Sequence, residues 1–372
     1  MKVLTVIGTR PEAIKMAPVI KAVQQSKKLD GLLCVTGQHR QMLDQVLQIF
    51  ELVPEYDLDL MRGNQDLSST FARIVQEVSN ILNKSQPDVV MVHGDTATTL
   101  ASSLAAYFHQ VPVAHVEAGL RTGNIYAPWP EEINRKMTAC VSRWNFAPTD
   151  MARDNLLREN VDPSTIHVVG NTVIDALLQV VNKIDGDAQI KQSLMDKFDY
   201  LDGSRRLLLI TGHRRESFGE GFKNICAAIK HLSKRKDLQI VYPVHLNPAV
   251  YEVVHEELSS QDNIHLIEPV NYLEMAFLMQ ASELLLTDSG GIQEEAPALG
   301  KPVLVMRETT ERPEALEAGT ARLCGTDQKN IIDSVSDLLD NPEIYQAMAR
   351  SNNPYGDGHS SSRIVSILEG ES

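Results

Sequence analysis

The segment from residue 284 to residue 306 constrains the fold of this chain more than any other part of the sequence. Its opening run, residues 284–286, is short and fully apolar, which is typical of a strand buried on both faces of a parallel sheet. A turn of small residues follows, and the pattern then predicts a helix over residues 292–299 and a new strand over residues 302–306. Strand, turn and helix in this order indicate an α/β unit.

The turn of this segment carries groups suited to an anion. The start of a helix offers unpaired backbone N–H groups, Ser289 adds a hydroxyl, and Gly290 and Gly291 let a phosphate approach the backbone closely. One turn later, Glu295 and the glutamate before it are acceptors suited to the hydroxyls of a ribose. The simpler alternative is an ordinary glycine turn capped by Asp288, with acidic residues that merely favour a helix start.

The same alternation recurs along both halves of the 372 residues, a length typical of two domains. We therefore predict an α/β protein with two Rossmann-like, doubly wound domains that face a central cleft. The expected border lies at residues 170 and 171, so that the domains span 1–170 and 171–358, and a final helix within 359–372 returns to the first domain. Strands are expected at residues 3–7, 32–36, 88–93, 111–116 and 144–149, the last of the first domain, and at 207–211, 239–243, 264–267, 284–286 and 302–306.

Composition and short motifs exclude several classes of function. The net charge of −14, from 35 basic and 49 acidic residues, argues against a nucleic-acid binder. The chain has no apolar run near the length of about 20 residues that spans a membrane, and its start resembles a strand rather than a signal peptide, so we expect a cytoplasmic protein. The 4 cysteines and 11 histidines show no metal-ligand spacing, and no dinucleotide or P-loop motif follows a strand. We expect neither a metal nor another cofactor.

Basic residues lie at the first expected strand-to-helix turn. Arg10 directly follows the strand and its turn, and Lys15 lies one turn into the helix. An open parallel sheet binds its ligands at this edge, so both side chains are candidates for anion contact, although they could also be ordinary surface cations. Gln38 and the His-Arg pair after it occupy the corresponding turn of the next strand, as part of the same crevice or as a solvated loop.

Two carboxylates follow successive strands of the first half. Asp95 comes after the strand at 88–93 and Glu117 after the strand at 111–116, so both are expected at the same edge of the sheet. Carboxylates that converge in a partly buried site repel each other, which raises a pKa and suits acid–base chemistry. In the alternative interpretation Asp95 caps a helix and Glu117 pairs with Arg121. Glu131, in the first turn of a later helix, is a third candidate or a simple partner of the helix dipole.

In the second half, His213 occupies the position equivalent to Arg10, with two arginines after it. A protonated histidine there would stabilise a departing diphosphate, whereas a neutral ring would only hydrogen-bond to it. Arg312 lies in the basic turn that follows the opening segment. We expect one wall of the cleft to carry Arg10, Asp95 and Glu117, and the other to carry His213, Ser289, Glu295 and Arg312.

Eight motifs, which together cover nearly the whole chain, resemble those of the non-hydrolysing bacterial UDP-N-acetylglucosamine 2-epimerases. They are the segments 8–15, 93–95, 116–121, 130–135, 211–216, 288–295, 310–314 and 353–358. The resemblance implies a fold like that of the glycosyltransferase-B enzymes and a homodimer. It also implies reversible interconversion of UDP-GlcNAc and UDP-ManNAc, by elimination of UDP, a 2-acetamidoglucal intermediate and re-addition of UDP, in the synthesis of surface polysaccharides.

The resemblance also assigns roles. Catalytic roles fall on Asp95, Glu117, Glu131 and His213, and substrate-binding roles on Arg10, Lys15, Ser289, Gly290, Gly291, Glu295 and Arg312. A second, activating UDP-GlcNAc site, present in some members, would involve Gln38, Gln41 and His245. Three alternatives remain open: a glycosyltransferase of the same fold, a hydrolysing epimerase that releases UDP and free ManNAc, and a sensor that binds the nucleotide sugar without turnover.

Overall fold

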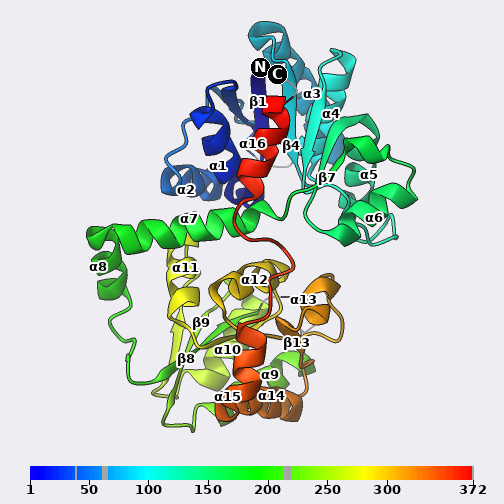
Figure 1. Ribbon diagram of the computed structural model, residues 1–372. Coiled ribbons are helices and arrows are strands. Elements are labelled where there is room, and N and C mark those ends of the chain that lie inside the picture. Colours follow the sequence, from blue (N-terminus) through cyan, green and yellow to red (C-terminus); the bar gives the residue numbers. More distant parts are fainter. Residues whose placement is uncertain (38–39, 61–65, 213, 215–218, 371–372) are drawn as a thin grey trace. The chain divides into compact units, whose positions relative to one another are not determined.

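The computed structural model describes residues 1–37, 40–60, 66–212, 214 and 219–370, which form two compact α/β units (Figure 1). The first unit comprises Met1–Gln179 and the segment from Tyr355 on, and the second comprises Val180–Pro354. The division falls inside the helix α7 (Thr172–Gly186), nine residues beyond the expected border at 170.

The first unit contains a seven-stranded parallel sheet in the order β3-β2-β1-β4-β5-β6-β7. The order reverses between β1 and β4, which is the place where a doubly wound sheet opens for a ligand. Its strands are β1 (Lys2–Ile7), β2 (Asp30–Val35), β3 (Tyr56–Asp57), β4 (Val89–His93), β5 (Val113–Val116), β6 (Ser142–Ala147) and β7 (Ile166–Val168). Its other helices are α1 (Arg10–Gln25), α2 (Arg40–Ile49), α3 (Leu67–Ser85), α4 (Ala97–Phe108), α5 (Glu131–Val141), α6 (Asp150–Arg158) and α16 (Ser360–Gly370).

The prediction that the sheet of the first unit ends with the strand at 144–149 is wrong, because β7 pairs with β6 beyond it. This edge strand has only three residues, none of them buried, and so lacks the apolar run by which a central strand is recognised. The two-residue β3 at the opposite edge was missed for the same reason.

The second unit contains a six-stranded parallel sheet in the order β10-β9-β8-β11-β12-β13. Its strands are β8 (Arg206–Thr211), β9 (Leu238–Pro243), β10 (Ile264–Ile267), β11 (Leu284–Thr287), β12 (Val303–Val305) and β13 (Ala321–Leu323). Its helices are α8 (Ala188–Lys197), α9 (Glu220–Leu232), α10 (Pro248–Leu258), α11 (Tyr272–Ala281), α12 (Gly290–Glu295), α13 (Pro313–Glu317), α14 (Gln328–Asp340) and α15 (Pro342–Ala349). The two parallel sheets confirm the predicted fold class.

The helix expected over residues 292–299 is divided in the structure. The α-helix α12 ends at Glu295, and residues Ala296–Leu299 continue as a 3₁₀ turn that Gly300 ends in the left-handed conformation. Pro297 explains the change, because it has no N–H to donate to the preceding turn of an α-helix.

Helix α16 belongs to the first unit, where it packs beside α1 (Figure 1). The Asp175 carboxylate of α7 accepts hydrogen bonds from the backbone N–H groups of Ser360 and Ser361, at 3.2 and 2.7 Å. At the other end of α16, Glu369 accepts a hydrogen bond from the Ser26 hydroxyl, at the end of α1. The first unit is thus built from two parts of the chain that are far apart in sequence.

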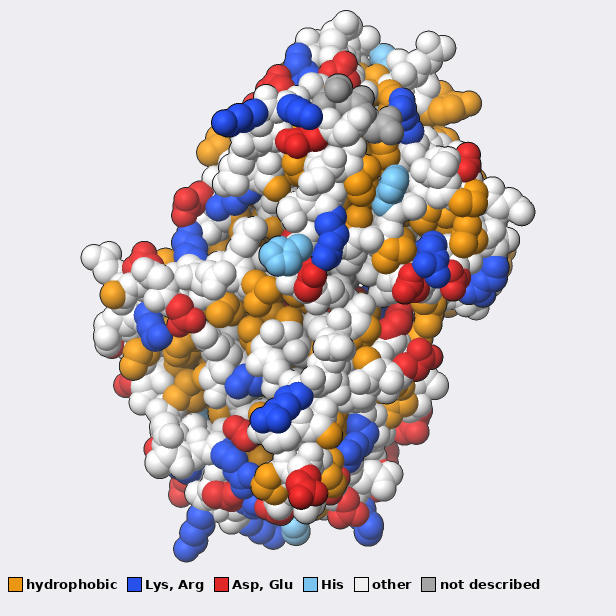
Figure 2. Space-filling model, in the orientation of Figure 1, with side chains coloured by type: hydrophobic (Ala, Val, Ile, Leu, Met, Phe, Trp, Pro, Cys, Tyr) orange, Lys and Arg blue, Asp and Glu red, His pale blue; other side chains and the backbone are white. Residues whose placement is uncertain are grey.

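The surface carries mixed charge. On the face drawn in Figure 2, basic and acidic side chains are interspersed, which is typical of an ordinary solvated surface. Within the described ranges, no helix combines the length and the apolar character that a membrane-spanning segment requires.

Candidate functional site

The candidate residues of the first unit lie where β1, β4 and β5 end. These three strands are neighbours in one parallel sheet, so their carboxyl ends meet at the same edge. Helix α1 starts at Arg10 after β1, Asp95 follows β4, and Glu117 follows β5. The sequence pattern predicted this arrangement from the order of the strands.

Glu12 connects the turn after β1 with the turn after β4 through hydrogen bonds. It was not among the predicted site residues. Its buried carboxylate accepts hydrogen bonds from the backbone N–H groups of Gly8 and Thr9, at 3.0 and 2.7 Å, and from the hydroxyls of Thr96 and Thr99, at 2.9 and 3.3 Å. Burial raises the pKa of Glu12, against these hydrogen bonds, which favour the carboxylate. The sequence does contain a pattern that indicates this role of Glu12. Thr9 lies three residues before Glu12, which is the spacing of a capping box at the start of a helix.

Glu117 forms an ion pair with Lys15, which reaches it from α1. Both side chains are nearly buried, with exposed fractions of 10% for Glu117 and 13% for Lys15. His93, the buried last residue of β4, places its Nε2 atom 3.8 Å from Glu117 Oε2. Arg121, considered from the sequence as the partner of Glu117, bonds to Glu159 with its Nη2 atom 2.7 Å from Oε2. The structure therefore brings Lys15 and Glu117 together.

Asp95 lies beside the same group with its side chain 29% exposed. Burial raises the pKa of Asp95 to about 6; the cation of Arg135 opposes this rise, and the charges of Glu117 and Glu131 add to it. The alternative in which Asp95 caps a helix is wrong, because Thr96 caps α4 and accepts a hydrogen bond from the N–H of Thr99.

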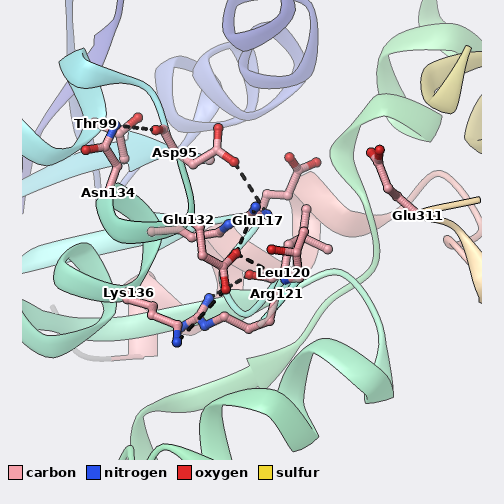
Figure 3. A network of polar contacts seen from close by, with 12 residues as sticks. Asp95, Thr99, Glu117, Leu120, Arg121, Glu132, Asn134, Lys136 and Glu311 are labelled. Carbon is pink, nitrogen blue, oxygen red and sulfur yellow. Dashed lines mark hydrogen bonds and ion pairs between the residues drawn. The ribbon is translucent and has the colours of Figure 1, made fainter. Parts of the chain in front are cut away.

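Helix α5 supplies the third carboxylate and further polar groups. Glu131 is its first residue and is partly buried, and Asn134 donates a 2.8 Å hydrogen bond to the backbone carbonyl of Asp95. Figure 3 shows the labelled Asp95, Asn134 and Glu132 in one network of polar contacts, together with Glu117. Glu132 and Arg135 were not predicted as site residues, and both are buried.

A buried histidine supports the backbone of this site. His115, in β5, places its Nε2 atom 2.7 Å from the carbonyl oxygen of Gly94, the residue before Asp95. Burial lowers the pKa of His115 to about 4, so the ring is neutral at neutral pH and Nε2–H donates to the carbonyl. The turn that carries Asp95 is therefore held from β5 as well as from α5.

In the second unit, the turns after β8 and β11 are joined by hydrogen bonds. The hydroxyls of Thr211 and Thr287, the last residues of the two strands, lie 2.6 Å apart. The buried Asp288 accepts a 2.7 Å hydrogen bond from the backbone N–H of Arg214. Ser289 precedes the first residue of α12 and makes no side-chain capping bond, and its own N–H donates to the Thr287 hydroxyl at 2.9 Å.

Gly290 and Gly291 form the first turn of α12, beside Arg312. A Cβ atom added to Gly290 would lie 3.9 Å from the guanidinium carbon of Arg312, so the cation lies directly against the helix start. Arg312 Nε also donates to the carboxylate of Glu294, which is buried. Glu295 accepts a 2.6 Å hydrogen bond from the Tyr272 hydroxyl, which orients its carboxylate.

Two further arginines lie near Arg312. Arg214 Nη1 and Arg307 Nη2 lie 3.3 and 3.6 Å from Glu311 Oε1. Although burial acts to raise the pKa of Glu311, the positive charges of Arg214, Arg307 and Arg312 lower it overall. Although the chain as a whole is acidic, three arginines lie close together at the edge of the second sheet, and one of them contacts the start of α12. Positive charge beside a helix start suits an anion such as a phosphate.

Three of the predicted residues lie wholly or partly outside the described part of the chain, and His245 lies in a loop. His213 and Gln38 lie outside the described residues, as does the side chain of Gln41. His245 is exposed in the loop before α10, where its Nδ1 atom accepts a hydrogen bond from the N–H of Asn247. Within residues 1–37, 40–60, 66–212, 214 and 219–370, no group of three or more His, Cys, Asp or Glu residues is arranged to hold a metal ion.

Comparisons with known proteins agree with the motifs. The family model for UDP-N-acetylglucosamine 2-epimerase matches residues 21–369. The chain is 55% identical over 369 residues to a probable UDP-N-acetylglucosamine 2-epimerase of Ralstonia nicotianae, with 99% of this chain and 98% of that protein covered. It is 54% identical over 370 residues to the UDP-N-acetylglucosamine 2-epimerase of Escherichia coli K12, with the same coverage.

Solved structures show the same likeness. The UDP-GlcNAc 2-epimerase from Neisseria meningitidis, in a crystal structure bound to UDP-GlcNAc, matches with a TM-score of 0.90 and 50% identity over 99% of each chain. A glycosyltransferase from Rickettsia africae, only 13% identical, matches with a TM-score of 0.64 over 99% of this chain and 98% of that one, and so shares the fold. These two matches confirm the glycosyltransferase-B-like fold.

Proposed function

The chain belongs to the UDP-N-acetylglucosamine 2-epimerase family, and from this premise we propose that it inverts carbon 2 of UDP-GlcNAc to give UDP-ManNAc, reversibly and without net loss of UDP. The single observation that carries the proposal is the group of carboxylates in the first unit. Asp95, whose pKa of about 6 lies close to neutral, is influenced by Glu117 and Glu131, and Glu117 in turn pairs with Lys15. Such a group is suited to proton transfer near neutral pH.

The chemistry of the sugar explains why carboxylates and cations are both needed. Carbon 2 has no adjacent carbonyl, so its hydrogen is scarcely acidic. Departure of UDP from carbon 1 gives that carbon oxocarbenium character, and loss of the proton from carbon 2 then yields a 2-acetamidoglucal. Re-addition of UDP, with delivery of a proton to the opposite face, inverts carbon 2. The route needs a proton-transferring group on each face and cations that stabilise the leaving diphosphate.

The two units supply these two kinds of group. In the first unit, Asp95, Glu117 and Glu131 share the proton transfers, and Arg10 and Lys15 contribute positive charge. In the second unit, Ser289, Gly290, Gly291 and Arg312 bind the diphosphate, together with His213, and Glu295 binds the ribose hydroxyls. Arg312 beside the start of α12, with Arg214 and Arg307 near the adjacent Glu311, supports the diphosphate assignment.

Three wider features of the proposal follow from the family alone. We propose that the protein is a homodimer and that its product serves the synthesis of surface polysaccharides. We also propose that Gln38, Gln41 and His245 contribute to a second, activating site for UDP-GlcNAc. Sedimentation velocity tests the dimer, and a sigmoidal dependence of rate on UDP-GlcNAc that becomes hyperbolic in a His245→Ala variant supports the second site.

Turnover in deuterated water, followed by NMR, tests the reaction. We expect deuterium at carbon 2 of sugar that is still linked to UDP, because the proton returned to carbon 2 comes from a group that exchanges with solvent. Free ManNAc with UDP would indicate a hydrolysing epimerase, and sugar on an added acceptor would indicate a transferase. Binding of UDP-GlcNAc without any exchange would indicate a sensor, and each of these three outcomes contradicts the proposal.

A further inference from the structure

Helix α5 contains a buried glutamate that bonds to backbone rather than facing solvent. Glu132 has no exposed surface, and its two carboxylate oxygens accept hydrogen bonds from the backbone N–H groups of Thr122 and Gly123, both at 3.1 Å. Two backbone donors of this kind fix the orientation of a carboxylate. Glu132 is therefore a buried carboxylate with a fixed orientation.

Arg135 lies between the carboxylates of Glu132 and Asp95. Its Nη2 atom is 3.0 Å from Glu132 Oε2, and its Nη1 atom is 3.5 Å from Asp95 Oδ2. The side chain of Arg135 is only 8% exposed, so its charge is poorly screened by solvent. A guanidinium group has a rigid planar fork and can bridge two carboxylates at once.

We propose that Arg135 is a positioning residue that sets the charge and orientation of Asp95 during epimerisation, and that Glu132 anchors Arg135 for this task. The inference rests on the proposed role of Asp95 in proton transfer. Glu132 competes with Asp95 for the same cation, so Asp95 receives enough positive charge to ionise near neutral pH but not enough to remain an inert, permanently ionised partner.

In the described part of the chain, four charged side chains act on the ionisation of Asp95. Lys15 approaches from α1, Glu117 from the end of β5, and Glu131 and Arg135 from α5. The two glutamates favour the protonated form of Asp95 and the two cations favour the ionised form, and Arg135 has the largest effect of the four. Loss of Arg135 must therefore raise the pKa of Asp95 further.

The experiment measures the pH dependence of kcat/KM in the wild type, Arg135→Gln, Arg135→Lys and the double variant Glu132→Gln/Arg135→Gln. The part of this pH profile that is governed by the ionisation of Asp95 is called the Asp95 limb. We expect this limb to move to higher pH by about one pH unit in Arg135→Gln. A shift of this size is the lower end of the pKa range for a carboxylate that loses a neighbouring cation. Arg135→Lys keeps the positive charge, so its limb should lie close to the pH of the wild-type limb. Its kcat should be lower, because an ammonium group does not bridge the two carboxylates as a guanidinium does.

The double variant tests whether an effect of Arg135→Gln comes from destabilisation of the fold rather than from Asp95. Arg135→Gln alone deprives the buried Glu132 of the cation at 3.0 Å and leaves it Lys136, whose Nζ atom is 4.0 Å from Oε1. The double variant removes both Glu132 and Arg135 charges and still deprives Asp95 of Arg135. We expect the same displaced limb there. Arg153→Gln is the matched control, since Arg153 pairs with Asp150 and Asp154 with its side chain 40% exposed, and its profile should equal that of the wild type.

An unchanged limb in both Arg135→Gln and the double variant would overturn the inference and reduce Arg135 to a structural residue. Such a result is distinguishable from failure of the proposed function, because the wild type is tested separately for deuterium incorporation at carbon 2. A wild type that exchanges, combined with variants whose limb does not move, contradicts the inference alone.

Discussion

The ammonium group of Lys15, one turn into α1, forms an ion pair with the carboxylate of Glu117, which follows β5 a hundred residues later in the chain. The pair connects two turns at the edge of one sheet. Because both side chains are nearly buried, neither charge is well solvated without the other. The ion pair thus fixes a candidate proton-transferring carboxylate at the edge of the sheet.

Replacement of Lys15 by methionine should therefore leave Glu117 as a poorly solvated charge. We expect a loss of about 3 kcal/mol in the free energy of unfolding, as for other buried pairs that lose one partner, and a fall in kcat that Lys15→Arg partly restores. Urea unfolding and steady-state kinetics provide the measurements. Lys197→Met is the control, because Lys197 pairs with Glu274 at 2.7 Å with half of its own side chain exposed, and it should change stability by less than about 1 kcal/mol.

Replacement of Asp95 by asparagine, or of Glu117 by glutamine, removes a proton-transferring group with little change in shape. We expect epimerisation and exchange at carbon 2 to fall by about 10²–10⁴-fold, the usual contribution of general acid–base catalysis, while binding of UDP remains measurable by calorimetry. Turnover at the wild-type rate in either variant removes that residue from the proposed mechanism.

The raised pKa of Asp95 also predicts an effect on stability. Its pKa is about 6 in the folded protein against 3.8 for the unperturbed group, so the folded state binds the proton more tightly than the unfolded state between these values. Asp95 therefore adds stability below about pH 4 and loses that contribution as pH rises through 6. Asp95→Asn should be more stable than the wild type at pH 7.5, by up to about 3 kcal/mol, and the difference should shrink toward pH 4.

Thermal unfolding at the two pH values measures this difference, and Asp202 provides a control of opposite sign. The hydroxyl and the backbone N–H of Ser204 and the guanidinium of Arg205 lower the pKa of Asp202 to about 2. Asp202→Asn should therefore destabilise the protein at pH 7.5. A destabilised Asp95→Asn variant at this pH would contradict the interpretation of Asp95.

In the second unit, Arg312→Met should impair both binding and folding. Arg312 lies against the start of α12, so its loss should weaken UDP binding, and it leaves the buried Glu294 without its cation at a cost of about 3–5 kcal/mol. The matched control is Arg322→Met, which breaks a 2.8 Å pair with Asp337 between partly exposed side chains. That variant should bind UDP normally and lose less than about 1 kcal/mol. Equal UDP affinity in the two variants would argue against Arg312 as a phosphate ligand.

Local patterns in the sequence were sufficient to predict the central strands and the placement of Asp95 beside Glu117. The reason is that β4 and β5 are adjacent, fully buried and parallel, so their apolar runs identify them and their ends must meet. Edge strand β7 was missed because an edge needs little apolar surface. The prediction of one continuous helix over residues 292–299 is wrong, because the segment with Pro297 forms a 3₁₀ turn. This proline was visible in the sequence.

The charged environment of the site was much less predictable. Glu132 and Arg135 occupy ordinary positions in the first turns of a helix, and only tertiary packing buries them. The same is true of Arg214 and Arg307, which come from separate loops and meet near Glu311. Burial of a charge depends on neighbours that are distant in sequence, so residue types and spacing alone do not reveal it.

The return of α16 to α1 has a consequence for biosynthesis. Because Asp175, and Ser26 at the end of α1, bond to Ser360, Ser361 and Glu369, a nascent chain must complete its entire second unit before the first unit gains these contacts. Ribosomes that stall late would release a product whose amino-terminal half still shows an uncovered helix face to chaperones and proteases.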